Sequence, residues 1–216
     1  LDKEEDAYSN EYITSAAAQA LHARVALYMQ DWDTAIEYAS ILIDDKKNTF
    51  KLADAKTKYN ADYTFFDYMW AYDLSYEIIW RIGFTETSYG SPLGTVFLNF
   101  TKDLTYYYPD YVPATAALNL YDAADLRYSG YFAGKEQGLT IGYTNGLDWP
   151  MLVKYYGNRN FTSKLIFHVS MPKPFRLAEQ YLIRAEAYCR KNDFTKAGND
   201  LTALRKMRYA SGGTLN

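Results

Sequence analysis

The sequence predicts a mainly α-helical protein in which two pairs of antiparallel helices flank a long, loop-rich insert with short strands. Two observations lead to this fold class. Apolar residues recur at three- and four-residue spacing in residues 9–44 and again in residues 174–209, which is the period of an amphipathic helix. Glycines and prolines punctuate the stretch between these segments. We therefore treat the chain as one domain with a helical scaffold at residues 1–50 and 171–216 and an insert at residues 51–170.

The first helical pair occupies residues 9–44. Ser9 or Asn10 can cap its first helix, and Gln30-Asp31 ends that helix. The apolar stripe of the first helix consists of Ile13, Ala16, Ala17, Ala20, Leu21, Ala23, Leu27 and Tyr28. The second helix carries a stripe at Trp32, Ala35, Ile36, Ala39, Leu42 and Ile43. Because only a short loop separates the two helices, we expect them to be antiparallel neighbours.

The second helical pair occupies residues 174–209 and repeats this design. Pro174 lies near the start of its first helix, where a missing N–H costs least. The stripe of that helix consists of Leu177, Ala178, Tyr181, Leu182, Ala185, Tyr188 and Cys189. After a turn at Asn192-Asp193, the next helix carries Phe194, Ala197, Leu201 and Leu204. Cys189 is the only cysteine, and its place on the stripe favours a small core residue over a nucleophile.

The two helical pairs align at a fixed offset of 162 residues. The matched positions are Ala23 and Ala185, Asp31 and Asp193, Trp32 and Phe194, Ala35 and Ala197, and Leu42 and Leu204. Small residues let two helices approach closely, and the aromatic residue is expected to plug the open end of the crossing. This pattern is typical of the tetratricopeptide repeat. Because two copies are few for a repeat array, a generic helical hairpin used twice stays an alternative.

The insert alternates short regular segments with long loops. Residues 75–82 are β-branched and aromatic and predict a short strand, whereas residues 114–121 predict a short helix. Residues 151–156 and 164–169 are predicted to be extended. Loops this long within a compact domain usually carry function, so we expect the binding site in the insert.

The composition is that of a globular protein. Hydrophobic residues make up 49% of the 216 residues and charged residues 23%, which excludes a disordered chain. The net charge is −3, so the basic excess of a general nucleic-acid binder is missing and no nucleic-acid partner is expected. No apolar run approaches the ~20 residues of a membrane helix.

The sequence offers little for catalysis or metal binding. His22 and His168 have no second ligand at metal spacing, and no motif of a hydrolase, phosphate loop or dinucleotide site is present. Five carboxylates of the insert can be considered for glycoside hydrolysis, but solvated loop residues are the favoured interpretation: Asp103, Asp110, Asp122, Asp125 and Asp148. Asp122 and Asp125 can also be considered for calcium. We expect no catalytic residue, no metal and no cofactor.

Aromatic residues are the unusual feature. The chain has 23 Tyr, 11 Phe and 4 Trp, which is 18% of its residues. Successive side chains point in different directions, so Tyr106, Tyr107 and Tyr108 cannot all be buried in one helix or strand. An exposed flat ring beside a polar group suits a sugar, whose C–H face stacks while its hydroxyls form hydrogen bonds.

Four motifs in order resemble the SusD/RagB family of Bacteroidota. They lie at residues 12–36, at 75–80, at 113–122 with 125–127, and at 175–188 with 200–205. The sequence FRLAEQYLIRAEAY at 175–188 is the clearest match. Together the motifs cover nearly the whole chain.

The resemblance implies a helical fold with tetratricopeptide-like pairs and no catalytic activity. Members of the family are lipid-anchored on the outward face of the cell outer membrane, where they bind glycans or other nutrients and pass them to a SusC-like TonB-dependent transporter. We therefore expect an oligo- or polysaccharide ligand, that transporter as a partner, and membrane attachment only through a lipid anchor. Family members are considerably longer and carry an N-terminal lipid-bearing Cys, so we expect this chain to be a fragment or single domain.

The resemblance also implies where the ligand binds. The binding aromatics of the family lie in loops after the strand at 75–82, where this sequence is rich in tyrosine. The glycan site is therefore predicted at Tyr89, Asn99, Tyr107, Tyr108 and Tyr111, with Trp149 as a second wall. Two alternatives stay open: these tyrosines only pack the insert, or the chain is a tetratricopeptide-type scaffold that binds a protein or peptide.

Overall fold

The chain forms two compact units. The computed structural model describes residues 10–47, 49–90, 92–99, 106–137, 139, 141 and 148–211. The helical unit contains the described residues up to 54, residues 74–83 and the described residues from 172 onward. The aromatic unit contains residues 55–73 and the described residues of 84–171. Residues 74–83 thus fold with the helices, although they lie within the expected insert.

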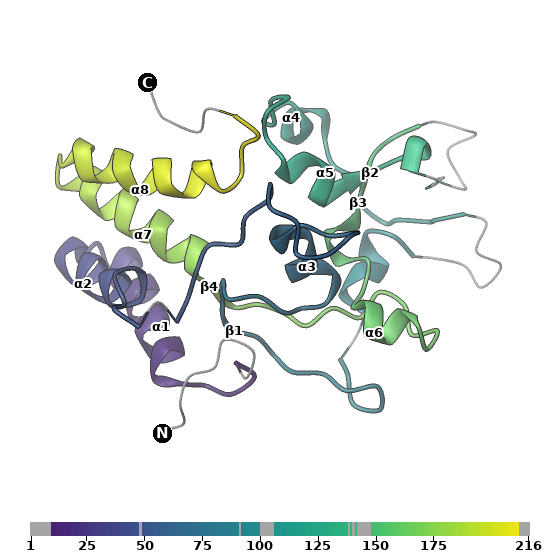
Figure 1. Cartoon of the computed structure of the whole chain (residues 1–216), viewed down its shortest axis with the longest axis horizontal. Helices are drawn as coiled ribbons and strands as arrows, with labels where there is room; N and C mark the ends of the chain where they lie inside the picture. The colour runs from purple at the N-terminus through teal and green to yellow at the C-terminus, as the bar shows by residue number, and fades with distance from the viewer. Residues whose placement is uncertain are drawn as a thin grey trace. The chain divides into compact units, whose positions relative to one another are not determined.

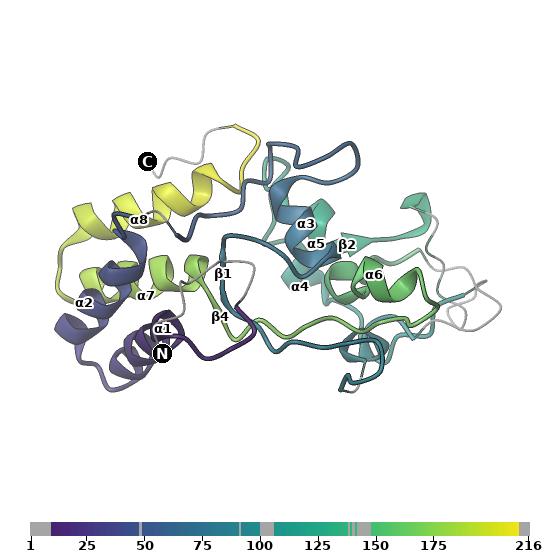
Figure 2. The same ribbon diagram turned by 60° about the horizontal axis from the view of Figure 1, so that its bottom comes forward.

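Stacked helices make up most of the helical unit (Figures 1 and 2). They are α1 (Ser15–Tyr28), α2 (Trp32–Ile43), α7 (Leu177–Arg190) and α8 (Phe194–Lys206). Contacts run from α1 to α2, from α2 to α7 and from α7 to α8, so the two pairs form one consecutive stack. The predicted mainly helical fold with tetratricopeptide-like pairs is confirmed.

The start of α1 differs from the prediction. Thr14 caps the helix, because its side-chain oxygen accepts the N–H of Ala17 at 3.3 Å. Asn10 instead donates its side-chain N–H to the carbonyl of Ile78 in the strand region. Ser9 lies outside the described residues.

The two helical pairs turn in the same way. Gln30 and Asn192 are equivalent positions of the repeat, and both adopt the left-handed backbone conformation, with φ of 60° and 61°. The next residue caps the following helix in each copy. Asp31 accepts a first-turn N–H at 3.2 Å, and Asp193 accepts one at 3.1 Å. The two pairs therefore share their turn conformation and their helix caps as well as their sequence pattern.

The helix crossings are as tight as the sequence predicts. Each of the alanines expected there is at most 6% exposed: Ala23, Ala35, Ala185 and Ala197. The expected aromatic plug is present only once. Trp32 packs against the buried residues of α1 and α2, whereas Phe194 is 64% exposed. Phe194 begins α8, the last helix of the described stack, so no further helix of that stack covers its ring.

The predicted stripe of α1 is partly wrong. Ile13, Leu21 and Tyr28 are exposed, although they were expected on the buried side. The buried face of α1 consists of alanines at positions 16, 17, 20, 23 and 26. Small side chains allow the close approach of α2, so the larger apolar residues point away from this contact.

The predicted stripe of α7 also needs correction. Leu182 and Cys189 are exposed, so Cys189 is not a core residue. The buried face of the helix includes Arg184 instead. Its guanidinium meets the carboxylate of Asp200 in α8 with two hydrogen bonds, of 2.8 and 2.7 Å. A paired ion tolerates this burial, and apolarity alone therefore does not identify the buried face.

A short antiparallel strand pair supports the helical unit. β1 (Ile78–Trp80) pairs with β4 (Phe175–Arg176). The predicted strand at 75–82 is thus present but shorter. The helix expected from Pro174 begins only at Leu177, because the two residues before it join the strand pair.

The aromatic unit consists of short elements joined by long loops (Figure 1). In chain order they are α3 (Phe65–Ala71), η1 (Leu93–Val96), α4 (Thr115–Leu118), α5 (Arg127–Tyr131), β2 (Phe132–Ala133), η2 (Lys135–Gln137), β3 (Met151–Leu152), η3 (Val153–Tyr155) and α6 (Arg159–Thr162). β2 and β3 pair antiparallel. A core of this unit includes Leu98, Tyr107, Ile141 and Met151.

The short elements predicted in the insert are only partly correct. The helix expected at residues 114–121 is present but shorter, as α4 (Thr115–Leu118). Only Met151–Leu152 of the segment 151–156 is a strand, and a 3-10 turn follows it. The segment 164–169 is not extended, because Leu165 and His168 adopt left-handed conformations with φ of 62° and 64°. That segment turns back, so that the N–H of His168 donates to the carbonyl of Tyr156 at 3.1 Å.

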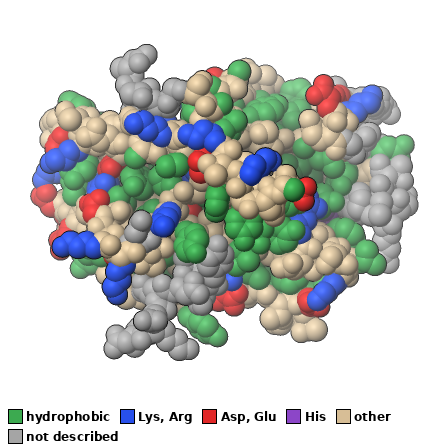
Figure 3. Space-filling view, viewed as in Figure 1, with side chains coloured by type: hydrophobic (Ala, Val, Ile, Leu, Met, Phe, Trp, Pro, Cys, Tyr) green, Lys and Arg blue, Asp and Glu red, His purple; other side chains and the backbone are tan. Residues whose placement is uncertain are grey.

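The side chains on the surface differ between the units (Figure 3). Acidic and basic side chains are interspersed over the helices, whereas hydrophobic side chains, with tyrosine counted among them, cover much of the visible face of the aromatic unit. Among the described residues, no helix is both long and apolar enough to cross a membrane.

Candidate functional site

Two loops of the aromatic unit bring several of the predicted site residues together. The N–H of Tyr108 donates to the carbonyls of Leu98 and Asn99, at 3.0 and 3.1 Å. The N–H of Tyr111 donates to the carbonyl of Val96 at 3.2 Å. Residues 92–99 and 106–111 therefore run beside each other, and we call them the loop pair. The loop pair joins Asn99, Tyr108 and Tyr111 in one region.

The loop pair presents polar and aromatic side chains to solvent. Tyr111 is 67% exposed and Tyr106 is 42% exposed. Asn99 is exposed and has φ of 40°, a left-handed conformation that asparagine tolerates better than most residues. Tyr108 is half-buried. The prediction that at least one of the three consecutive tyrosines is exposed is confirmed.

Tyr107 and Trp149 pack inside the aromatic unit. Tyr107 is only 6% exposed, and burial together with a hydrogen bond to Tyr156 raises the pKa of its hydroxyl. The indole N–H of Trp149 donates to the carbonyl of Pro113 at 2.8 Å. Both rings contribute to the core around Leu98, which favours the packing interpretation for these two residues.

Tyr89 lies on a separate segment of the aromatic unit. It is 42% exposed and follows a turn in which the N–H of Ser88 donates to the side chain of Thr85 at 3.0 Å. The predicted residues thus fall into an exposed group on the loop pair, a packed group in the core, and Tyr89 on its own segment.

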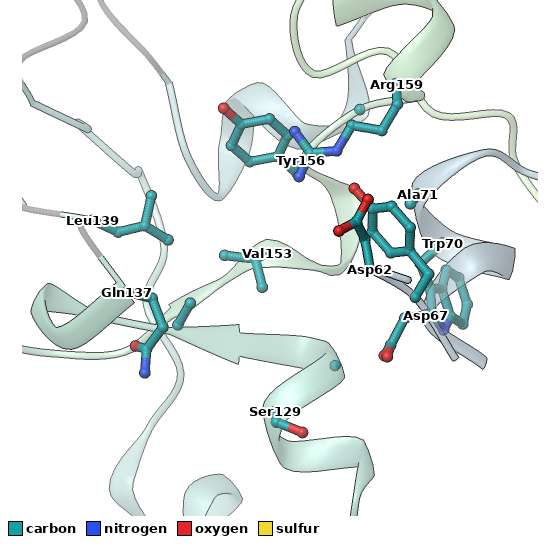
Figure 4. Close-up of a pocket in the computed structure, with 14 residues that line it drawn as sticks. Asp62, Asp67, Trp70, Ala71, Ser129, Gln137, Leu139, Val153, Tyr156 and Arg159 are labelled. Carbon is teal, nitrogen blue, oxygen red and sulfur yellow. The ribbon is translucent and has the colours of Figure 1, made fainter. Parts of the chain in front are cut away.

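The aromatic unit also contains a pocket that sequence reasoning missed. Its volume is about 510 Å³. The residues that line it come from α3, α5, η2, η3 and α6 and from the loops beside them, and include Asp62, Asp67, Trp70, Gln137, Tyr156 and Arg159 (Figure 4). Sequence spacing does not reveal it, because residues 62–71 and 153–159 meet only in the folded chain.

The charged groups of the pocket are held in different ways. The guanidinium of Arg159 lies 4.4 Å from the ring centre of Tyr156, and Figure 4 shows the two side chains together at one side of the pocket. Thr64 caps α3, and Asp67 completes the capping box with one carboxylate oxygen, which accepts the hydroxyl of Thr64 at 2.7 Å. Asp62 lies on the loop before α3 and is exposed.

A group of stacked tyrosines borders this pocket. Tyr63 lines the pocket, and its ring meets the ring of Tyr72 edge-on with centres 5.6 Å apart. The rings of Tyr68 and Tyr72 are stacked at 4.5 Å, and those of Tyr59 and Tyr68 lie 4.0 Å apart. We call these four residues the tyrosine ladder. Burial and the neighbouring hydroxyl of Tyr59 raise the pKa of Tyr68. In the sequence, the tyrosine ladder is visible as a cluster of four tyrosines within residues 59–72.

One of the two histidines, His22, lies at the surface, and the other, His168, is buried. The ring of His22 is exposed on α1 and lies 3.8 Å from that of Tyr38. His168 is buried, which lowers its pKa, and its Nδ1 lies 3.1 Å from the carbonyl oxygen of Tyr156.

The acidic residues considered for calcium have protein partners. Both carboxylate oxygens of Asp125 bind the guanidinium of Arg127, and Asp122 accepts the N–H of Ala124 at 2.8 Å. No group of three or more potential metal ligands occurs within the described ranges of the chain. Asp103 lies outside the described residues.

Comparison with known structures identifies the fold. The chain superimposes on a SusD superfamily protein from Bacteroides thetaiotaomicron VPI-5482 with a TM-score of 0.71, at 22% identity, over 96% of this chain and 44% of that one. The chain has the SusD-like fold. A SusD-like carbohydrate binding protein from Bacteroides vulgatus ATCC 8482 matches at 20% identity and a TM-score of 0.69, over 100% of this chain and 40% of that one.

A further structure with the SusD-like fold contains a ligand. It is surface glycan-binding protein A from Bacteroides thetaiotaomicron in complex with laminarihexaose, at 18% identity and a TM-score of 0.66, covering 98% of this chain and 51% of that one. The chain therefore spans about half, or less, of the length of these structures. No protein-family model matches the sequence, and no curated protein matches it.

Proposed function

We propose that this chain binds glycans through the exposed side chains of the loop pair. The observation that carries the proposal is that the loop pair holds two exposed tyrosines, Tyr106 and Tyr111, together with the exposed side chain of Asn99. The SusD-like fold supports it, since solved structures with this fold include a carbohydrate binding protein and a surface glycan-binding protein.

The chemistry of these residues suits a sugar. An exposed tyrosine ring offers a flat apolar face to the C–H side of a pyranose, and its hydroxyl stays available to water or a sugar hydroxyl. The amide of Asn99 can donate to and accept from hydroxyl groups. By analogy with aromatic pairs, one stacked ring contributes ~0.5–1.5 kcal/mol beyond the area that it buries.

The proposed wider role rests on the resemblance of the sequence to the SusD/RagB family. We propose that the protein acts at the cell surface, held at the outer membrane by a lipid anchor, and passes its ligand to a SusC-like TonB-dependent transporter. In this proposal it binds the glycan without cleaving it, which the solved structures with this fold support, since they include a carbohydrate binding protein and a surface glycan-binding protein.

A second candidate function rests on helix α1. Leu21, Val25, Tyr28 and Met29 are all at least 43% exposed, so α1 and its C-cap carry apolar side chains that no described neighbour covers. Such a surface favours a tetratricopeptide-type scaffold for a protein or peptide. Capture of displayed peptides by the wild type, but not by Tyr28→Ala, would support this alternative.

Affinity gel electrophoresis tests glycan binding. The chain is run through gels that contain laminarin, amylopectin, galactomannan, polygalacturonate or alginate, beside a gel without polysaccharide. We expect retardation by at least one of them, weakened by up to about tenfold in Tyr111→Ala. Tyr12→Ala is the matched control, because Tyr12 is 70% exposed in the helical unit. Migration unchanged by every polysaccharide would contradict the proposal.

A further inference from the structure

We propose that the pocket lined by Asp62, Tyr63 and Arg159 is a second sugar subsite, and that it takes an uncharged pyranosyl unit. This inference rests on the proposed function, because it names the chemical class of glycan that the protein takes. The location differs from that of the proposed site, because none of the glycan-binding residues predicted from the sequence lines this pocket.

The size of the pocket fits one or a few sugar units. Its volume of about 510 Å³ lies within the usual range of small-molecule sites, ~300–1000 Å³. Apolar walls come from Val153 and Leu139, and Figure 4 shows both side chains among the polar ones. A mixture of apolar walls with a few polar groups is the usual composition of such a site.

The aromatic walls of the pocket are held in place before any ligand arrives. Tyr63 is fixed by edge-on contacts with Tyr68 and Tyr72 of the tyrosine ladder, with ring centres 6.4 and 5.6 Å apart. The ring of Tyr156 is in contact with the guanidinium of Arg159, 4.4 Å from its centre. Rings that are already ordered lose little conformational entropy on binding, which favours affinity.

The polar groups of the pocket supply both kinds of hydrogen-bonding partner. A carboxylate only accepts and a guanidinium only donates, whereas a sugar hydroxyl does both. One carboxylate oxygen of Asp67 accepts the hydroxyl of Thr64, the N-cap of α3. The other oxygen lies 3.0 Å from the position that a Cβ atom on Gly130 would take. The missing side chain at Gly130 keeps that oxygen open to the pocket.

The balance of charge selects against acidic sugars. Two carboxylates, Asp62 and Asp67, line the pocket with one guanidinium, Arg159, so the formal charge of the lining residues is negative. The ammonium of Lys154 is not part of the lining and lies over the ring of Trp70, 4.2 Å from its centre. A uronate or sulfate group would meet like charges there, which is unfavourable in a partly enclosed site. An uncharged pyranose meets no such penalty and can use both carboxylates as acceptors.

The test uses the same polysaccharide gels with pocket variants. Asp62→Asn removes the charge-assisted hydrogen bond, and we expect retention by the best neutral polysaccharide to fall about five- to tenfold. Tyr63→Ala should weaken retention by up to about tenfold, whereas Tyr63→Phe, which keeps the ring, should stay near the wild type. Glu37→Gln is the matched control, because it makes the same charge change on an exposed residue of α2 in the helical unit.

The outcomes separate this inference from the proposed function. If Tyr111→Ala weakens retention but Asp62→Asn and Tyr63→Ala do not, the pocket is not a subsite and the proposed function stands. Stronger retention of the wild type by polygalacturonate or alginate than by any neutral polysaccharide overturns the charge argument. If no polysaccharide retains the wild type, the proposed function fails, and this inference fails with it. Tyr63→Ala removes a ring of the tyrosine ladder, so its melting temperature is measured as well. If Tyr63→Ala is unfolded, the retention of Asp62→Asn alone decides whether the pocket is a subsite.

Discussion

Glu77 and Arg208 form an ion pair of 2.6 Å whose side chains are almost completely buried in the helical unit, at 0% and 4% exposure. Arg176 of β4 binds the other carboxylate oxygen of Glu77 at 2.7 Å, and the N–H of Ala53 donates to Glu77 at 2.8 Å. Three groups from separate parts of the chain thus bind one buried carboxylate. Burial of a charge is tolerated when it is paired and fully hydrogen-bonded, as it is here.

Replacing this carboxylate should destabilise the helical unit strongly. Glu77→Gln leaves the guanidinium of Arg208 buried without its counter-charge, and breaking a buried pair in this way costs roughly 3–5 kcal/mol. Urea unfolding measures the loss. Glu37→Gln, on the exposed side of α2, should change the free energy of unfolding by less than about 0.5 kcal/mol. Equal stabilities of the two variants would show that the buried pair contributes nothing specific.

The same carboxylate makes stability depend on acidic pH. Burial raises the pKa of Glu77, but Arg208 and Arg176 outweigh this and hold it below its ordinary value of 4.5. The unfolded chain therefore binds a proton at higher pH than the folded chain does. This contribution is fully present above pH 4.5 and is lost as pH falls through the lower, folded pKa. Urea unfolding between pH 7 and pH 3 should show a shallower decline in Glu77→Gln than in the wild type, and identical declines would refute the assignment.

The alanine crossings should tolerate no larger side chain. Ala185 is 4% exposed on α7, and Ala185→Leu overpacks its contact at a cost of roughly 1–3 kcal/mol. Ala18→Leu makes the same change at an exposed position of α1 and should be nearly neutral. Thermal unfolding followed by circular dichroism compares them. A parental melting temperature for Ala185→Leu would count against the repeat interpretation.

Neighbouring tyrosines of the loop pair should have opposite effects. Tyr107 is buried in the aromatic core, so Tyr107→Ala should cost roughly 3–5 kcal/mol of stability. Tyr111 is 67% exposed, so Tyr111→Ala should keep the parental stability while it weakens glycan retention. Differential scanning calorimetry and affinity gels on both variants test this division. A large loss of stability in Tyr111→Ala would assign that ring to packing instead.

The helical part of the fold is readable from the sequence because each signal is local. The spacing of Ala23 and Ala35 fixes a helix crossing, and Asp31 marks the start of the next helix by its own cap. The sequence predicts buried positions for Phe194 and Cys189, but both are exposed, because burial there depends on which helix lies beyond them. The burial of such a residue depends on how the helices stack, and the sequence of its own helix does not reveal it.

The candidate site is less predictable for a related reason. Glycine and proline locate the loops but not the contacts between them, so Tyr107 was expected at the ligand although it lies in the core. The pocket joins Asp62 and Tyr63 with Tyr156 and Arg159, residues far apart in the sequence. No periodicity links such positions, and only the folded chain brings them to one cavity.

Ring stacking on a sugar is the central claim, and saturation-transfer difference NMR tests it most directly. The aromatic protons of the protein are saturated in the presence of an oligosaccharide derived from the polysaccharide that is retained best, or from each polysaccharide in turn. We predict transfer to the C–H protons of the sugar, strongly reduced in Tyr111→Ala and unchanged in Tyr12→Ala. Absence of transfer from the wild type to every oligosaccharide, or equal transfer in Tyr111→Ala, would contradict the account.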